Sequence, residues 1–189
     1  MTAGRLRGAF VATASTWAAL LVLVPFLASR AHASIAASAL IVGVYALGGF
    51  ICHQLPERSF HPWTAQMPVC ARCAGIYFGA MVGAAASLVR TAKGVRHITP
   101  DVVHGASVAA GTVEVVQGFG AARRAARTAQ PAAYVRIALA LAVTPSLATL
   151  LYEWTTATMP SHAIRAAAGV PIGVVVAWLI VAAADNDFK

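Results

Sequence analysis

Five long apolar segments account for most of this chain, and their length leaves few folds open to it. They cover residues 9–29, 34–51, 71–89, 134–154 and 163–184. An α-helix rises about 1.5 Å per residue, so roughly 20 apolar residues cross a hydrocarbon core about 30 Å thick. The sequence therefore predicts an all-α, polytopic transmembrane helix bundle with about five spans, forming a single integral membrane domain over residues 1–189.

The composition agrees with a membrane protein and argues against a soluble one. Hydrophobic residues make up 59% of the chain and charged residues 11%, whereas a soluble domain is usually about a quarter charged. The net charge of +8 would suggest a nucleic-acid partner in a soluble protein. So few charges cannot build a solvated surface that reads nucleic acid. We therefore expect the lipid bilayer as the partner and no nucleic acid.

Residues 102–119 form a weakly apolar stretch that is harder to place. The stretch contains His104, Glu114 and Gln117, and a carboxylate in mid-membrane costs about 2.5 kcal/mol or more on insertion scales. We therefore interpret residues 90–133 as a basic loop or surface helix, with a sixth span as the alternative. Basic residues flank the stretch on both sides: Arg90, Lys93, Arg96, Arg123, Arg124 and Arg127.

Basic residues collect at the cytoplasmic ends of membrane spans. Here the five-span and six-span arrangements place the same excess of Lys and Arg inside, but with opposite orientations of the N-terminus. The sequence alone therefore leaves the orientation undecided.

Two of the apolar segments carry glycines at four-residue spacing. These glycines are Gly75, Gly79 and Gly83 in one segment and Gly169 and Gly173 in the other. Small residues at this spacing form a seam that lets the backbone of another helix approach closely. We expect these seams to be helix contact surfaces, including contacts within a homo-oligomer. We also expect Pro171 to kink the last helix, which packed neighbours tolerate in a membrane.

The three cysteines lie within 22 residues of one another. Cys52 and His53 end the second apolar segment, and Cys70 and Cys73 begin the third. Two antiparallel helices joined by a loop of about 18 residues would bring these ends together. Cys70 and Cys73 have the i, i+3 spacing of paired metal-binding thiolates, and three Cys with one His complete a closed tetrahedral zinc site. We therefore predict a structural metal site, most simply zinc, at Cys52, His53, Cys70 and Cys73.

Two other roles for the cysteines remain open. Cys70 and Cys73 form a CxxC pair that could serve a membrane thiol-disulfide oxidoreductase, with Cys52 as the resolving thiol and Arg72 lowering a thiolate pKa. No thioredoxin-like βαβ pattern surrounds this pair. The cysteines could also pack as small apolar side chains at the helix ends.

The fourth ligand of the predicted metal site has two candidates, His53 and His61. Adjacent ligands such as Cys52 and His53 are awkward for one ion, so His53 could instead orient a ligand while His61 completes the site. The c-type haem signature is absent because Ala74, not His, follows Cys73. Hydrolase and nucleotide motifs are also absent, so we expect no haem, no nucleotide and no catalytic residues.

The loop between the second and third segments carries more charge than a simple connector needs. Glu57 and Arg58 could pair with each other, or Arg58 and Arg72 could form a two-guanidinium clamp for a phosphate or carboxylate. The alternative is interfacial anchoring, in which arginines snorkel beside an aromatic belt. The aromatic residues available for such a belt are Phe60, Trp63 and Tyr77.

Glu153 lies near the end of the fourth segment, and Arg165 follows it across a short turn. An ionisable group at this depth is a functional hypothesis by default, but structural pairing with Arg165 is equally compatible with the sequence. A small transporter or a binder of anionic lipid headgroups would need such polar residues along a path between helices. The candidates for that path are Arg58, Arg72, Glu153, His162 and Arg165.

The residues around the cysteines resemble a family signature. They read CHQLPERSF from Cys52 and PVCARCAGIYFG from Pro68. These stretches closely resemble the signature of the domain-of-unknown-function 2085 family of bacterial predicted membrane proteins, and the match is dense over residues 52–79. The resemblance implies a bacterial multi-pass protein of the inner (cytoplasmic) membrane whose biochemical activity is not established.

The resemblance weakens outside this region. Thr149 stands where many family members have Asp, and Glu153 stands where they have Gln, so this helix departs from the family's polar pattern. Residues 94–122 look like an insertion. The residues that do fit the family's last two helices are Pro145, Arg165, Gly169 and Gly173.

Overall fold

The computed structural model describes residues 3–30, 34–96 and 131–186, which fold into helices joined by short loops. The predicted all-helical fold is confirmed for these residues. The predicted surface segment at 102–119 lies outside them, whereas residues 90–96 are the last turns of a helix. The α-helices are α1 (Ala3–Ala28), α2 (Ile35–Ile51), α3 (Ala71–Arg96), α5 (Pro131–Thr156) and α6 (His162–Asn186), and two 3₁₀ turns, η1 (Pro56–Arg58) and η2 (Pro62–Thr64), lie between α2 and α3.

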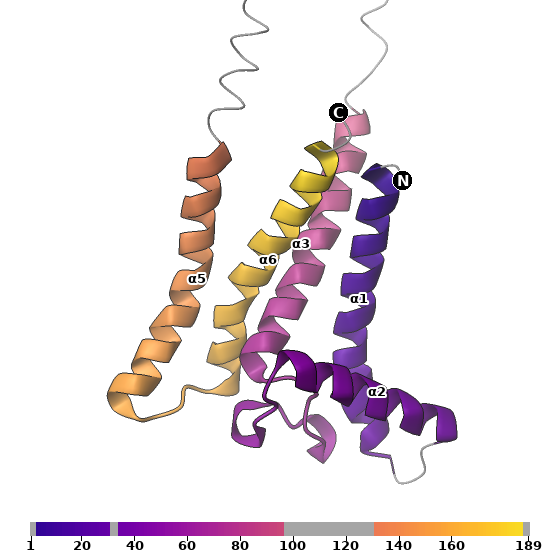
Figure 1. Ribbon diagram of the computed structural model, residues 1–189, viewed down its shortest axis with the longest axis vertical. Helices are drawn as coiled ribbons and strands as arrows, with labels where there is room; N and C mark the ends of the chain where they lie inside the picture. The colour runs from indigo at the N-terminus through magenta and orange to yellow at the C-terminus, as the bar shows by residue number, and fades with distance from the viewer. Residues whose placement is uncertain (1–2, 31–33, 97–130, 187–189) are drawn as a thin grey trace, which may run out of the picture.

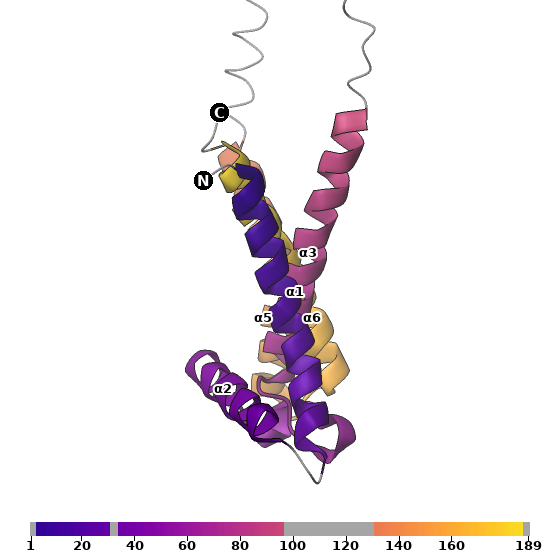
Figure 2. The same cartoon turned by 90° about the vertical axis from the view of Figure 1, so that its right-hand side faces the viewer.

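Four of these helices, α1, α3, α5 and α6, are long and apolar enough to cross a membrane. All four run roughly along the long axis of the molecule, and α2 lies across one end of them (Figures 1 and 2). With 17 residues, α2 is about 25 Å long, shorter than a typical hydrocarbon core. The structure thus contains the five expected helices, but four rather than five of them are long enough to span a membrane, and α2 lies across the bundle instead.

Contacts near its C-terminal end hold α2 in this crosswise position. Gly48 packs so closely on the backbone carbonyl of Pro68 that a Cβ atom there would overlap it. The hydroxyl of Tyr45 donates a hydrogen bond to the carbonyl of Gln66, and the side chain of Gln54 donates to the carbonyl of Tyr45 at 2.8 Å. These contacts fasten α2 to the loop that precedes α3, and they depend on residues far apart in the sequence.

The two glycine seams pack against each other in the contact between α3 and α6. Gly75 faces the backbone of Ala166, and Gly79 faces the backbone of Val170. The constant offset between partners shows that the two helices run in the same direction. The remaining pairs are Gly83 with Val174, Gly169 with Arg72, and Gly173 with Ile76. Both seams are therefore occupied within one chain, and a homo-oligomer would need another surface.

The four spans give the bundle two chemically different ends. The start of α1, the end of α3, the start of α5 and the end of α6 point toward the same end of the molecule, where α3 diverges from the others (Figure 2), and α2 with the cysteine loop lies at the other end (Figure 1). The first end carries Arg5, Arg7, Arg90, Lys93, Arg96 and Arg136, and the second carries Arg30, Arg58, Arg72 and Arg165. Because basic residues favour the cytoplasmic side, we expect the cysteine loop to face away from the cytoplasm.

This orientation predicts the outcome of a thiol-labelling experiment on intact cells. A cysteine at Thr158, which is exposed between α5 and α6, should react with a membrane-impermeant maleimide. A cysteine at Gly4, where no neighbouring atom lies within 4 Å of the place that a Cβ atom would take, should react only after the membrane is permeabilised. The unsubstituted chain measures the background from its own cysteines. The reverse labelling pattern would show that the basic end faces outward.

Candidate metal centre

The loop between α2 and α3 is shaped by polar side chains that bind its backbone. Gln54 has a φ of 50°, a left-handed conformation that is unfavourable for a residue with a side chain. Its side-chain amide donates hydrogen bonds to the carbonyls of Tyr45 at 2.8 Å and Pro68 at 2.7 Å. The side chain of Gln66 donates in turn to the carbonyl of Gln54 at 2.5 Å. These bonds stabilise the turn that directly follows Cys52.

A second group of contacts returns the chain to the start of α3. Ser59 is fully buried, and its hydroxyl donates to the carbonyl of Leu55 at 2.9 Å. Ser59 and Cys70 form an isolated antiparallel bridge, and the amide of Met67 donates to the carbonyl of Phe60 at 2.8 Å. The loop therefore ends beside the point at which it begins.

This folding brings the three cysteines together. Cys52 directly follows α2, Cys70 directly precedes α3, and Cys73 lies in the first turn of α3. Their Sγ atoms all lie within 4.8 Å of one another, and each side chain is half-buried. The backbone amide of Cys70 also donates to the Sγ of Cys52 at 3.2 Å. The three cysteines are therefore positioned to hold a metal ion.

The surroundings of Cys70 favour its thiolate form. The pKa of Cys70 is lowered to about 5, chiefly because the thiol of Cys73 hydrogen-bonds to it. Partial burial opposes this effect, and further hydrogen bonds from the backbone of Cys73, the thiol of Cys52 and the backbone of Arg72 add to it. A thiolate is the form of cysteine that binds metals and acts as a nucleophile.

The predicted histidine ligands lie outside this cluster. Within residues 3–30, 34–96 and 131–186, the ligand atoms gathered around this point are those of the three cysteines. His53 is exposed and lines a cavity beside the cysteines. His61 is exposed and lines a different cavity of about 400 Å³, together with Trp63 and Met67. The structure therefore brings together three of the four residues in the predicted zinc set.

A cavity of about 410 Å³ opens beside the three sulfur atoms. Arg58 lies in its wall, and the Nε atom of this side chain is buried without a hydrogen-bond partner among the described residues. Glu57 is exposed. The residues that line the cavity are Ile51, Cys52, His53, Gln54, Leu55, Arg58, Cys70 and Cys73.

Arg72, between the cysteines of the CxxC pair, connects α3 to α5. Its Nη2 donates to the hydroxyl of Thr149 at 2.9 Å, and that hydroxyl donates to the carbonyl of Ser146 at 2.9 Å. The hydroxyl of Ser146 donates to the carbonyl of Ala168 on α6 at 2.8 Å. Arg58 thus lies in the cavity wall, whereas Arg72 binds α5. This arrangement differs from the two-guanidinium clamp considered from the sequence.

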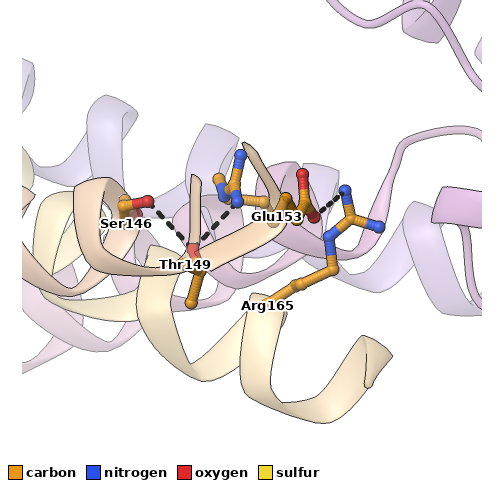
Figure 3. A network of polar contacts seen from close by, with 5 residues as sticks. Ser146, Thr149, Glu153 and Arg165 are labelled. Carbon is orange, nitrogen blue, oxygen red and sulfur yellow. Dashed lines mark hydrogen bonds and ion pairs between the residues drawn. The ribbon is translucent and has the colours of Figure 1, made fainter. Parts of the chain in front are cut away.

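Glu153 lies one turn beyond Thr149 on α5, and it forms an ion pair with Arg165 on α6 (Figure 3). An Nη2 atom of Arg165 lies 2.8 Å from a carboxylate oxygen of Glu153, and the two side chains are 4% and 8% exposed, respectively. Ser146, Thr149 and Glu153 follow i, i+3, i+7 spacing, so they share one face of α5. This polar face lies toward the bundle, while Leu147 and Leu151 on other faces are exposed.

Several residues that shape the site were not assigned a role from the sequence. Gln54, Ser59 and Gln66 build the loop, and Thr149 receives the hydrogen bond from Arg72. Gln54 and Ser59 lie within the family-like signature, and this position was a sequence signal that they shape the site. The helical spacing of Thr149 and Glu153 offered another signal, because it places both on one face.

Parts of the chain match known sequences. Two uncharacterized archaeal proteins are 55% identical to parts of the chain, one from Methanocaldococcus jannaschii over 40 residues and one from Methanothermobacter thermautotrophicus over 31 residues. The matches cover 21% and 16% of this chain, respectively, and 26% and 28% of the relatives, so the chain matches about a quarter of each relative's length. A bacterial source is therefore not supported.

No solved structure shows a significant match to the chain. A family model does match, and its match extends to residue 120, across most of the stretch that was interpreted as an insertion. The helices α5 and α6 lie beyond the matched region. Residues 52–120, which contain all three cysteines, are thus similar to the family described as Predicted membrane protein (DUF2085).

Proposed function

We propose that this chain is a multi-pass membrane protein whose cysteine loop is organised by a thiolate-bound metal ion, most simply Zn²⁺. The observation that carries the proposal is the placement of three Sγ atoms within 4.8 Å of one another. Tetrahedral zinc with bonds of about 2.3 Å holds its sulfur ligands about 3.8 Å apart. Small side-chain rotations would therefore bring Cys52, Cys70 and Cys73 onto one ion.

The proposal gives the metal a structural task. Cys52 ends α2, whereas Cys70 and Cys73 begin α3, so a shared ion would join the crosswise helix to a spanning helix. The left-handed Gln54 and the buried Ser59 lie in the loop that this ion would close. Metal binding to such a site contributes directly to the stability of the folded state.

The metal content of purified protein tests this proposal. We expect about one zinc per chain and little or no zinc after Cys70→Ser or Cys73→Ser, because a thiolate ligand is lost. His61→Ala should retain zinc, since His61 lines a separate cavity. Protein that contains no metal after expression with ample zinc would contradict the proposal. Stoichiometric iron in the purified protein would show that the bound metal is iron rather than zinc.

A membrane thiol-disulfide oxidoreductase is the second candidate, favoured by the lowered pKa of Cys70 beside Cys73. Counting alkylated thiols by mass spectrometry separates the two functions. A metal site predicts three thiols that become reactive when a chelator is added. A redox pair predicts two thiols that become reactive only after treatment with a reductant.

A further inference from the structure

The three cysteines leave one position of a tetrahedral metal site to be filled. Structural zinc sites are closed by four protein ligands, whereas sites with three protein ligands keep one position for an external group. Among the described residues, the cluster of ligand atoms contains three sulfur atoms and no histidine nitrogen. The origin of the fourth ligand therefore depends on the space next to the sulfur atoms.

That space is the cavity of about 410 Å³, whose wall includes all three cysteines. Its volume lies within the range of small-molecule sites, roughly 300–1,000 Å³, and is much larger than a single water needs. Ile51 and Leu55 contribute apolar surface to its wall. A small organic molecule would fit this combination of volume and lining better than a lone water molecule.

Arg58 gives the cavity a preference for negative charge. Its guanidinium is permanently charged, and its buried Nε has no hydrogen-bond partner among the described residues. The ion pair between Arg165 and Glu153 does not involve Arg58. The other titratable side chains in the cavity wall are His53 and the three cysteines. An acidic group on a ligand would give the Nε of Arg58 a hydrogen-bond partner.

We propose that a small thiol with an acidic group enters this cavity, binds the metal through its sulfur and binds Arg58 through its acid. The proposal rests on the proposed metal site and deepens it. Soft sulfur donors suit a metal that is already held by thiolates, and the apolar wall accommodates the short hydrocarbon between the two groups. The thiol binds as a thiolate, so its proton is released to solvent.

Protein loaded with Co²⁺ in place of zinc tests the proposal, because cobalt absorption bands respond to a change of ligand. We expect 3-mercaptopropionate to shift these bands saturably, whereas propionate, which has no thiol, should not. Arg58→Gln should weaken the binding of 3-mercaptopropionate about tenfold or more, since a charge-assisted hydrogen bond is lost. Arg58→Lys should recover part of this affinity.

The control ligand is 1-propanethiol, which has the sulfur but no acid. It should bind the unsubstituted chain and Arg58→Gln with equal affinity. If Arg58→Gln instead lost the same affinity for 1-propanethiol as for 3-mercaptopropionate, the role of Arg58 would be overturned. Unchanged bands with every thiol, together with altered bands in His53→Ala, would assign the fourth position to His53 and overturn the proposal. Failure to bind any cobalt or zinc would instead overturn the metal site itself.

Discussion

Gly75→Ala is expected to destabilise the bundle by about 3 kcal/mol or more, the upper part of the range for overpacking. A Cβ atom at this position would overlap the backbone carbonyl of Ala166 on α6. A backbone carbonyl cannot turn aside as a side chain can, so α3 and α6 would have to separate. Separation would also loosen the neighbouring contact between Gly79 and Val170, because both contacts lie on one seam.

The matched control is Gly8→Ala in α1. No neighbouring atom lies within 4 Å of the Cβ position at Gly8, and alanine favours a helix over glycine. The free energy of unfolding, measured by denaturant titration in one detergent, should fall for Gly75→Ala and stay level or rise for Gly8→Ala. Equal stability of the two variants would mean that α3 and α6 do not pack through their glycines.

Removing one partner of the buried ion pair between Glu153 and Arg165 should lower the free energy of unfolding about as much as Gly75→Ala. Glu153→Leu leaves Arg165 buried without a counter-charge, which costs roughly 3–5 kcal/mol in comparable buried pairs. Both side chains are at least nine-tenths buried in the structure. We therefore expect a strong loss of unfolding free energy, or loss of the folded protein from the membrane fraction.

The double variant Glu153→Leu with Arg165→Met separates charge from packing. Replacing both partners by apolar residues of similar size is often neutral or stabilising, so the double variant should recover most of the lost stability. Thr149→Val serves as a second comparison, because it removes the hydroxyl that binds Arg72 but leaves the ion pair intact. A double variant that is less stable than Glu153→Leu would show that the pair has a role beyond charge balance.

The sequence predicted the all-helical fold because length and apolarity are local properties of a segment, but the expected span at 34–51 is the short helix α2. The predicted segment 134–154 lies within α5 (Pro131–Thr156), and 163–184 lies within α6 (His162–Asn186). The approach of Cys52 to Cys70 also followed from local information, since a short loop between two apolar segments keeps their adjacent ends close.

The fourth metal ligand could not be predicted in the same way. His53 is next to Cys52 in the sequence, yet the left-handed turn at Gln54 and its two hydrogen bonds shape the chain there. The sulfur atoms gather while the imidazole of His53 stays exposed. The direction of a side chain in a loop depends on such tertiary hydrogen bonds, which residue spacing does not encode.

The sequence by itself determined that the chain forms several helices long and apolar enough to cross a membrane and carries its cysteines around the loop between two apolar segments. Only the tertiary structure decided that α2 lies across the bundle, that the glycine seams of α3 and α6 face each other, and that more of the described basic residues lie at one end of the bundle than at the other. The physical reason is that each of these features depends on contacts between distant segments, such as Gly48 with Pro68 and Gly75 with Ala166.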